Sequence, residues 1–470
     1  MIILGTNSIK DTGFDVANSV RMNRGSSDYF RRTNNTAGTS DKIGTYSGWV
    51  KRSTTTLDGM FFEGKDLAAS NYTQIYFQGS GALTIYSSGG MDLVTTSLYR
   101  DPSAWYHVCV AFDTTQGTAA NRVKLYVNGT QVTSFATETY PSQNSTIYFG
   151  VNGDQQAIGI REDGALLWNG YMAEICYVDG QALAQTDFGE FDEDSGIWKP
   201  KNVSGLTFGN NGCYLDFQDA SNLGNVVAGN STDFTENGLT SIDQSTDTCT
   251  NNFATMNPLN VPTSNAPTFS EGNLQSISSS SASGSFGGSS SIGVSSGKWY
   301  IEAKALFSGH TQAAIGVTYN DAETARTNND ATDSYEYIYR ANGNKIHDNS
   351  ASSYGDTYTT NDIIGIAIDL DNHKIYWSKN GTFQNSGDPT TGATGTGSAF
   401  DLDTGQTYMF FHQDNTGASS NTSSFSFNFG SPAYSESGGN SDADGYGNFK
   451  TAPPSGYFAL NTKNLSEYGG

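Results

Sequence analysis

The feature that most constrains this chain is a set of short runs rich in β-branched and aromatic residues, separated by turn-forming residues. One group lies at Trp105–Phe112 and Val123–Gly129. A second lies at Gly297–Glu302, Ile363–Leu370 and Lys374–Gly381. Runs of this length and composition, bounded by Gly, Asn and Ser, are typical of β-strands. The sequence therefore predicts two separate β-structures, each built from short strands.

The composition supports an all-β chain with few helices. Polarity comes from Ser, Thr, Asn and Gly, because only 15% of the residues are charged, and 54 of the 470 residues are Gly. There are 26 Tyr and 26 Phe, which favour strands. No long segment places apolar residues at i, i+3, i+4 and i+7, as a helix would require. The length exceeds one ordinary core, so we expect two or three domains.

The charge balance narrows the range of partners. The formal net charge is −23 and the isoelectric point is about 4.4, so the chain repels DNA and RNA, and no nucleic-acid partner is expected. Anionic membrane surfaces are also disfavoured. No stretch approaches the roughly 18 apolar residues of a membrane span, so no membrane insertion is expected. The apolar start, Met1–Gly5, lacks a basic region and a cleavage site, which favours a first β-strand over a signal peptide.

The four cysteines do not form a metal-binding pattern. They are Cys109, Cys176, Cys213 and Cys249, and no two have the C-x-x-C spacing of a zinc site. Cys109 and Cys176 each lie inside a predicted strand. We expect buried thiols, because Cys packs as a small apolar residue. The alternative is one disulfide across the first β-structure.

The first region resembles a known type of β-sandwich. Its predicted strands are Ser19–Asn23, Thr45–Lys51, Thr73–Phe77, Leu83–Tyr86, Trp105–Phe112, Thr146–Gly150 and Gly170–Gly180, with a hairpin over Val123–Phe135 that turns at Asn128-Gly129. The strand W-x-H-V-x-V-x-F, the hairpin V-x-L-Y-V-N-G and the segment G-x-M-A-E-I-x-x-V-D-G-x-A-L occur in that order. Together they resemble the laminin-G and pentraxin branch of concanavalin A-like jelly rolls. The resemblance implies such a domain over residues 1–200.

The later region resembles a SPRY domain over residues 266–432. Gly297–Glu302 is similar to its G-K-W-Y-x-E strand, and Asp362–Asp369 to its D-x-I-G-x-x-x-D segment. The resemblance places the Ser- and Gly-rich run at 276–297 inside the domain as a loop or hairpin. Residues 201–265 are expected to be a partly ordered connector, and residues 433–470 a polar tail. The predicted fold class is all-β, with two jelly-roll-type antiparallel β-sandwiches, laminin-G-like and SPRY-like, joined by that connector.

The pairing of these folds, with the ending G-Y-F-A-L-N-T-K-N-L, resembles virion proteins of tailed bacteriophages, such as tail-fibre or minor structural proteins. The resemblance implies a non-enzymatic adhesin that is assembled in the host cytoplasm and resides in the virion. Its expected partners are other virion proteins, a host surface glycan or protein, and further copies of itself, with a trimer taken from fibre analogy. The alternative is a capsid or tail decoration protein, since the sequence has no coiled-coil heptads or β-helix repeats to form a shaft.

A polysaccharide depolymerase is the third function considered. One family of concanavalin A-like hydrolases carries its catalytic carboxylates as E-x-D-x-x-E on one strand, where alternate side chains face one cleft. The nearest string here is Glu190–Ser195, in which Ser195 replaces the acid/base. A solvated acidic loop is the favoured interpretation. The five histidines form no recognisable nucleophile or zinc motif, and His107 is expected to be packed or half-buried. No catalytic residue is predicted.

Two kinds of binding residue are considered, and no cofactor is assigned. The laminin-G and pentraxin resemblance makes calcium a possibility, with Asn152, Asp154 and Asp179 as oxygen donors; an ordinary Asn-Gly-Asp turn is the alternative. For a sugar, Tyr335, Tyr337 and Tyr339 alternate along one strand and so share one face. That face forms either an exposed binding platform or part of the core.

Overall fold

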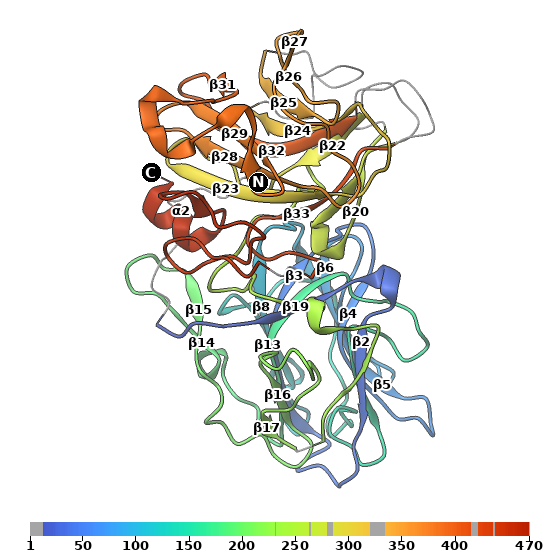
Figure 1. Cartoon of the computed structure of the whole chain (residues 1–470). Coiled ribbons are helices and arrows are strands. Elements are labelled where there is room, and N and C mark those ends of the chain that lie inside the picture. Colours follow the sequence, from blue (N-terminus) through green and yellow to red (C-terminus); the bar gives the residue numbers. More distant parts are fainter. Residues whose placement is uncertain are drawn as a thin grey trace. The chain divides into compact units, whose positions relative to one another are not determined.

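The computed structural model describes residues 13–469, apart from residues 231, 263–264, 280–284, 320–333, 415–421 and 436–437 (Figure 1). The predicted first strand at Met1–Gly5 lies outside these residues. The chain is 41% strand and 7% helix, which confirms the all-β prediction. It divides into a first unit, Asp11–Thr250, and a second unit, Asn251–Gly470.

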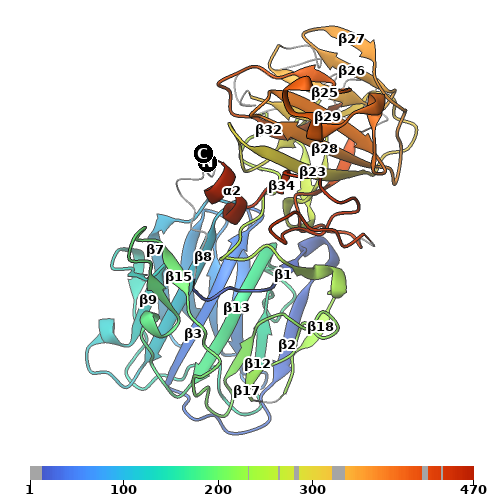
Figure 2. The same ribbon diagram turned by 60° about the vertical axis from the view of Figure 1, so that its left-hand side comes forward.

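The first unit is a sandwich of two antiparallel sheets. One, which we call the β3 sheet, has the order β10 (Thr130–Gln131), β9 (Val123–Val127), β8 (Trp105–Asp113), β3 (Ile43–Arg52), β13 (Gly170–Asp179), β1 (Ser19–Met22), β19 (Gln244–Ser245), with β16 (Cys213–Leu215) on β13 and β17 (Ala228–Gly229) on β16 (Figure 2). The other, the β5 sheet, has the order β11 (Phe135–Thr139), β7 (Met91–Leu98), β6 (Ala82–Ser87), β5 (Tyr72–Phe77), β4 (Gly59–Lys65), β12 (Gln155–Ile158), β2 (Tyr29–Thr33), β18 (Thr235–Asn237). A two-stranded ribbon, β14 (Gly189–Phe191) with β15 (Trp198–Pro200), completes the unit.

The core of the first unit lies between the two sheets. The burial pattern along each strand shows whether one or both faces of that strand are covered. On β9 buried and half-buried residues alternate, so this strand leaves one face to solvent. On β13 all ten residues are buried. The second face of β13 is covered by an outer apolar cluster that includes Val203, Phe208 and Tyr214. Segments from residues 201–250 therefore complete this sandwich.

The structure divides the chain differently from the predicted 201–265 connector. Residues 201–250 supply four strands to the sheets of the first unit, as well as the core residues Leu215, Phe217 and Phe234. Residues after Asn251 belong to the second unit, where Ala254 and Met256 enter the core. The two units therefore meet at residue 250 with no separate connector of this length. The segment is mostly polar, so its composition did not predict that its few large apolar residues enter a core. These residues pack on sheets formed by other parts of the chain.

Two local predictions for the first unit also need correction. The hairpin turns at Asn128-Gly129, with φ values of +46° and +74°, but its second arm is only the two residues of β10. Phe135–Thr139 forms β11, which joins the β5 sheet instead. Thr146–Gly150 is not a strand, although Ile147 and Phe149 are buried in the core.

The cysteines are unpaired and three of them are buried. Ser47 on β3 pairs with Cys109 of β8 on one side and with Cys176 of β13 on the other. Two strand spacings of about 4.8 Å put the Cα atoms of Cys109 and Cys176 about 9–10 Å apart, beyond the roughly 7 Å that a disulfide spans. The disulfide alternative is therefore excluded.

The second unit is also a sandwich of two sheets. The first sheet has the order β20 (Thr268–Ser270), β21 (Gln275–Ile277), β33 (Ser424–Asn428), β23 (Lys298–Ala305), β28 (Ile363–Asp369), β29 (Lys374–Lys379), β30 (Thr382–Phe383), with β31 (Phe400–Asp401) on β29 and β34 (Phe458–Ala459) parallel to β23. The second has the order β22 (Ser285–Ser289), β32 (Met409–Asp414), β24 (Ala313–Thr318), β25 (Glu336–Arg340), β26 (Asn344–His347), β27 (Ser350–Ser353). As predicted, the Ser- and Gly-rich run at 276–297 lies within this unit.

The predicted polar tail is part of the second unit. Its helix α2 (Thr462–Tyr468) is capped by Asn461, whose side chain accepts a hydrogen bond from the Asn464 amide at 2.9 Å. Leu460 and Leu465 are buried in the core. The carboxylate of Glu302, on β23, accepts hydrogen bonds from the backbone amides of residues 450 and 451 at 2.8 and 2.9 Å. Charge-assisted bonds of this kind hold the last segment against the sheet.

Short 3-10 helices connect the strands. They are η2 (Arg24–Ser26), η3 (Ala119–Asn121), η4 (Gln185–Asp187), η5 (Ser241–Asp243), η6 (Glu271–Asn273), η7 (Gln384–Ser386) and η8 (Pro389–Thr394). None of the helices in the described part of the chain has the length and apolar character that crossing a membrane requires.

Candidate functional site

The predicted sugar-binding tyrosines do not form an exposed platform. Tyr337 and Tyr339 lie on β25 with 1% and 0% of their surface exposed, so the alternative, a strand that packs its tyrosines in the core, holds for these two. Tyr337 stacks on His347 with ring centroids 4.1 Å apart, and the Tyr339 hydroxyl donates to the backbone carbonyl of Asp356. Tyr335 precedes β25 and is half-buried beside Tyr319.

The residues considered for calcium do not fit a common ion. Both carboxylate oxygens of Asp179 accept hydrogen bonds from backbone amides, those of Thr39, Ser40 and Asn211, at 2.7–3.1 Å. Asn152 is exposed. Asp154 is buried, and burial, followed by the charge of Asp66, raises its pKa to about 7. Among the described residues, no group of three or more His, Cys, Asp or Glu lies where it could hold a metal ion.

The acidic string Glu190–Ser195 lies on the β14–β15 ribbon, outside the two main sheets. Asp192 accepts hydrogen bonds from the Ser195 amide and hydroxyl, and these, with Lys199, lower the pKa of Asp192 to about 2. Glu190 pairs with Lys201 at 3.2 Å. The string is thus an ion-paired surface turn, and its carboxylates do not face one cleft from a sheet strand.

His107 is packed, as predicted. It is 1% exposed and lies between Trp49 and Trp198. The Trp198 indole donates to its Nδ1 at 3.1 Å, so its Nε2 carries the proton and donates to the Ser47 hydroxyl at 2.8 Å. Burial lowers its pKa to about 3, and the ring stays neutral.

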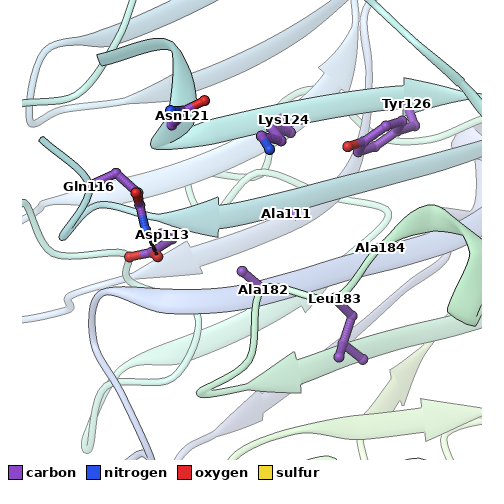
Figure 3. Close-up of a pocket in the computed structure, with 9 residues that line it drawn as sticks. All are labelled: Ala111, Asp113, Gln116, Asn121, Lys124, Tyr126, Ala182, Leu183 and Ala184. Carbon is purple, nitrogen blue, oxygen red and sulfur yellow. Dashed lines mark hydrogen bonds between the residues drawn. The ribbon is translucent and has the colours of Figure 1, made fainter. Parts of the chain in front are cut away.

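The clearest candidate site is a groove on the outer face of β8 and β9, which we call the β8–β9 groove (Figure 3). Its volume is about 360 Å³. Ala111 of β8 pairs with Lys124 of β9, and Asp113 and Tyr126 follow two positions along their strands on the same face. Because the Ala111 side chain is small, the groove is deep at this position. The remaining lining residues are Gln116 and Asn121 at one end and Ala182, Leu183 and Ala184 along one wall.

The polar groups of the groove are held ready for hydrogen bonding. Burial raises the pKa of Asp113, but hydrogen bonds from Thr115 and Gln116 outweigh this effect and the pKa falls below its usual value. Asp113 is therefore a fixed carboxylate at one end of the groove. Burial, then Cys109, raises the pKa of Tyr126, so its phenol remains a donor. Figure 3 shows the Tyr126 hydroxyl directed along β9 toward Lys124.

Lys124 stands out among the basic residues. Within the described residues of the first unit, every other Lys and Arg donates to a carboxylate or to a backbone carbonyl. Lys124 has no ion-pair or hydrogen-bond partner in this part of the chain. Its ammonium group is half-exposed at the groove and free to donate to a ligand.

The sequence contained one signal for this groove. The run Val-Lys-Leu-Tyr-Val at 123–127 alternates, which places Lys124 and Tyr126 together on the face opposite the core residues Val123 and Leu125. The depth of the groove depends on Ala111 and on the segment 182–184, which lies across β8 from β9 and is held to β3 by the hydrogen bond from the Leu183 amide to the Thr45 hydroxyl (Figure 3). That part had no local signal.

Comparison with known proteins gives two domain matches. Residues 24–187 match the laminin-G-type model of the concanavalin A-like lectin/glucanases superfamily, and residues 298–400 match the SPRY domain model. The chain therefore contains a concanavalin A-like domain and a SPRY domain, which confirms both predicted resemblances. Each match covers less than half of the chain.

Individual relatives are distant. The chain is 30% identical over 92 residues to an ATP-dependent RNA helicase, DDX1, of Xenopus laevis, and it spans 12% of the length of that protein and 20% of its own. The SPRY domain of human HERC1 is similar over 33% of this chain and 86% of that chain, with a TM-score of 0.27 and 18% identity. A heptameric SAP-like pentraxin of Limulus polyphemus is similar over 36% of this chain and 80% of its own, with a TM-score of 0.27 and 17% identity.

Proposed function

We propose that this chain, which combines a concanavalin A-like domain with a SPRY domain, is a non-enzymatic binding protein of a tailed-phage particle. In this proposal the β8–β9 groove of the first unit binds a saccharide on the host surface. The protein acts as an adhesin or tail-fibre component, in several copies that add avidity to weak single-site binding.

The β8–β9 groove carries the proposal. A sugar ring has an apolar C–H face and a rim of hydroxyl groups that both donate and accept hydrogen bonds. Tyr126 offers a half-exposed ring for the apolar face, Lys124 a free donor, and Asp113 an oriented acceptor. The amides of Gln116 and Asn121 add groups of both kinds. Polar groups make up the larger part of the lining, which suits a ligand rich in hydroxyl groups.

The particle context rests on the resemblance of the whole chain to phage virion proteins. The proposal of a non-enzymatic role is supported by the geometry of Glu190–Ser195, which forms an ion-paired ribbon and does not line the groove. Asp113 is the only carboxylate in the described lining of the groove, whereas glycoside hydrolysis uses a facing pair.

The test is binding of purified full-length protein to host cells, beside cells of a mutant host that lacks its surface glycan. Saturable binding that disappears with the glycan is expected. Tyr126→Ala should weaken it at least tenfold, because the stacking surface is lost. Tyr140→Ala is the matched control, since Tyr140 is also half-buried in the first unit but lies outside the groove.

Other outcomes point elsewhere. Equal binding to both hosts would overturn the saccharide proposal. No binding by an intact oligomer at micromolar concentration would favour the alternative, a capsid or tail decoration protein whose contacts are with virion neighbours.

A further inference from the structure

A second hollow lies on the outer face of the β5 sheet, on the other side of the sandwich from the β8–β9 groove. Its volume is about 280 Å³. Glu63 and Lys65 of β4 and Tyr72 and Gln74 of β5 line it, together with residues 161–163 of the loop that follows β12. Gln74 lies directly opposite Glu63, and Tyr72 opposite Lys65, so the four side chains share one face of adjacent strands.

The ring of Tyr72, which lines this hollow and lies beside Tyr86, forms an aromatic platform. The rings of Tyr72 on β5 and Tyr86 on β6 are stacked, with centroids 5.9 Å apart and an interplanar angle of 25°. Tyr86 lies opposite Gln74 and therefore faces outward with Tyr72. Both side chains are half-buried, so part of each ring remains open to solvent. The buried tyrosines of β25 have almost no ring surface that is open to solvent.

The polar groups around the platform are fixed by their own contacts. Glu63 is 1% exposed and accepts hydrogen bonds from the Gln74 amide and from the Glu162 backbone amide, both at 2.6 Å. Because these side chains are already held in place, little conformational entropy is lost when a ligand binds. It also holds Gln74 in one orientation, with its second amide hydrogen and its carbonyl oxygen left for other partners.

Both cations that line the hollow are paired with carboxylates, and the third carboxylate, Glu63, has no cationic partner among the lining residues. Lys65 pairs with Glu162, and Arg161 pairs with Asp163 at 2.8 Å. No cation in this hollow is left over to attract an acidic ligand. The surroundings therefore suit an uncharged molecule with many hydroxyl groups.

We propose that this hollow is a second saccharide subsite, in which an uncharged sugar ring stacks on Tyr72 and its hydroxyl groups bond to Gln74. The choice of ligand class rests on the proposed function, but the site itself lies on a different sheet from the β8–β9 groove. One first unit then carries two binding sites, and a branched or repeating glycan is bound by avidity.

The experiment titrates full-length protein with a panel of neutral hexose oligosaccharides by calorimetry. Wild type is expected to bind about two oligosaccharides per chain. Tyr72→Ala and Tyr126→Ala should each leave one site, with at least a tenfold loss of affinity at the other, and the double variant should leave none. Tyr72→Trp keeps an aromatic platform and is expected to restore binding.

The matched control is Tyr29→Ala. Tyr29 is half-buried on the same outer face, beside Arg31 at 4.8 Å, but does not line the hollow, so its loss should leave both sites intact. A thermal melt of each variant separates loss of the site from loss of the fold.

The outcomes separate the two proposals. If Tyr126→Ala abolishes all binding and folded Tyr72→Ala changes nothing, the second subsite is wrong and the proposed function stands. If Tyr72→Trp binds no better than Tyr72→Ala, the platform role is wrong. If intact wild-type protein binds no oligosaccharide and no host glycan, both proposals fail.

Discussion

The tyrosines that line the two hollows of the first unit are placed differently from the tyrosines of β25 in the second unit. In the first unit Tyr72 and Tyr126 are half-buried on outward faces of the two sheets, each beside a hollow. In the second unit Tyr337 and Tyr339 are buried in the core. An aromatic ring serves a ligand only where the surrounding chain leaves its face open. The difference is the reason why the proposed saccharide sites lie in the first unit, whereas Tyr337 and Tyr339 of the second unit serve packing.

The cause of the difference lies in how many faces of a strand are covered. On β9 only alternate residues are buried, so Tyr126 remains on a solvated face. On β25 the first four residues are all buried, because Ile338, which points away from Tyr337 and Tyr339, packs in a smaller apolar cluster of its own. A strand covered on both faces has no side on which to present a ring.

The largest expected effect tests where the first unit ends. A fragment of residues 11–250 should fold, whereas one of residues 11–200 should not. The shorter fragment lacks Cys213, Leu215, Phe217, Leu223 and Phe234 from the core. At about 1.5–3 kcal/mol for each large side chain, this loss rivals the whole stability of a typical domain, about 5–15 kcal/mol.

Circular dichroism and urea unfolding of the two fragments give the answer. Cooperative unfolding of the 11–200 fragment would mean that the sandwich is complete without the later strands. The outer face of β13 would then be a free surface, and the comparison of covered and uncovered faces would have to be redrawn.

The next largest expected effect tests the comparison of buried and half-buried tyrosines directly. Tyr339→Ala removes a fully buried ring and should destabilise the second unit by about 3–5 kcal/mol, as is usual for large core aromatics. Tyr126→Ala should change the stability of the first unit by less than about 1 kcal/mol, because the side chain is already half solvated. Urea unfolding measures both. Equal losses would remove the distinction between packing and presenting tyrosines.

Buried carboxylates sharpen the same contrast with a smaller effect. Glu302 of the second unit is fully buried and accepts hydrogen bonds from two backbone amides, from Asn428 and from the Tyr300 hydroxyl. Glu302→Gln turns one acceptor into a donor that faces these groups, so we expect a loss of about 2–3 kcal/mol and easier proteolysis of residues 450–469. Glu63 of the first unit accepts two such bonds, and Glu63→Gln should cost about 1 kcal/mol. The reverse order would contradict a greater role for Glu302 in holding its unit together.

Much of this fold could be predicted from the sequence, because its longest strands are locally encoded. The runs around Trp105, Gly170, Trp299 and Ile363 became β8, β13, β23 and β28 at nearly the expected bounds. The Asn128-Gly129 turn was also recognisable, since these residue types accept positive φ. Short strands such as β12 were missed because four residues carry too little pattern.

The candidate sites were predicted less well, for a physical reason. Alternation shows which side chains share a face, but not which face another segment covers. Tyr337 and Tyr339 do share one face of β25, but that face is the core, and Tyr335 lies before the strand begins. In the same way, nothing local places the segment 182–184 in one groove with Tyr126, because that arrangement depends on the pairing of strands far apart in the chain.

The smallest expected effect is the change in stability with pH that is caused by a buried carboxyl group of the first unit. Burial, then the charge of Asp66, raises the pKa of Asp154 to about 7, above its usual value near 4 in the unfolded chain. The native state therefore holds this proton more tightly, and stability is lost as the pH rises from about 4 through 7. Asp154→Asn removes the loss, so the stability of the variant relative to wild type should rise by about 1–2 kcal/mol between pH 5 and pH 8, after allowance for solvent screening.

Asp113→Asn is the matched control for that measurement. Hydrogen bonds keep the pKa of Asp113 below its usual value, so Asp113 is ionised in both the folded and the unfolded state over the whole range. Its contribution is present above the unfolded pKa and is lost only as the pH falls below about 4. Urea unfolding at several pH values should therefore give a constant difference for Asp113→Asn and a rising one for Asp154→Asn. A flat difference for both would mean that Asp154 is ionised in the folded chain throughout, with a partner for its buried oxygen. The polar edge of the first unit would then resemble the carboxylates of the second, which are matched by donors, and the contrast between the units would rest on their tyrosines alone.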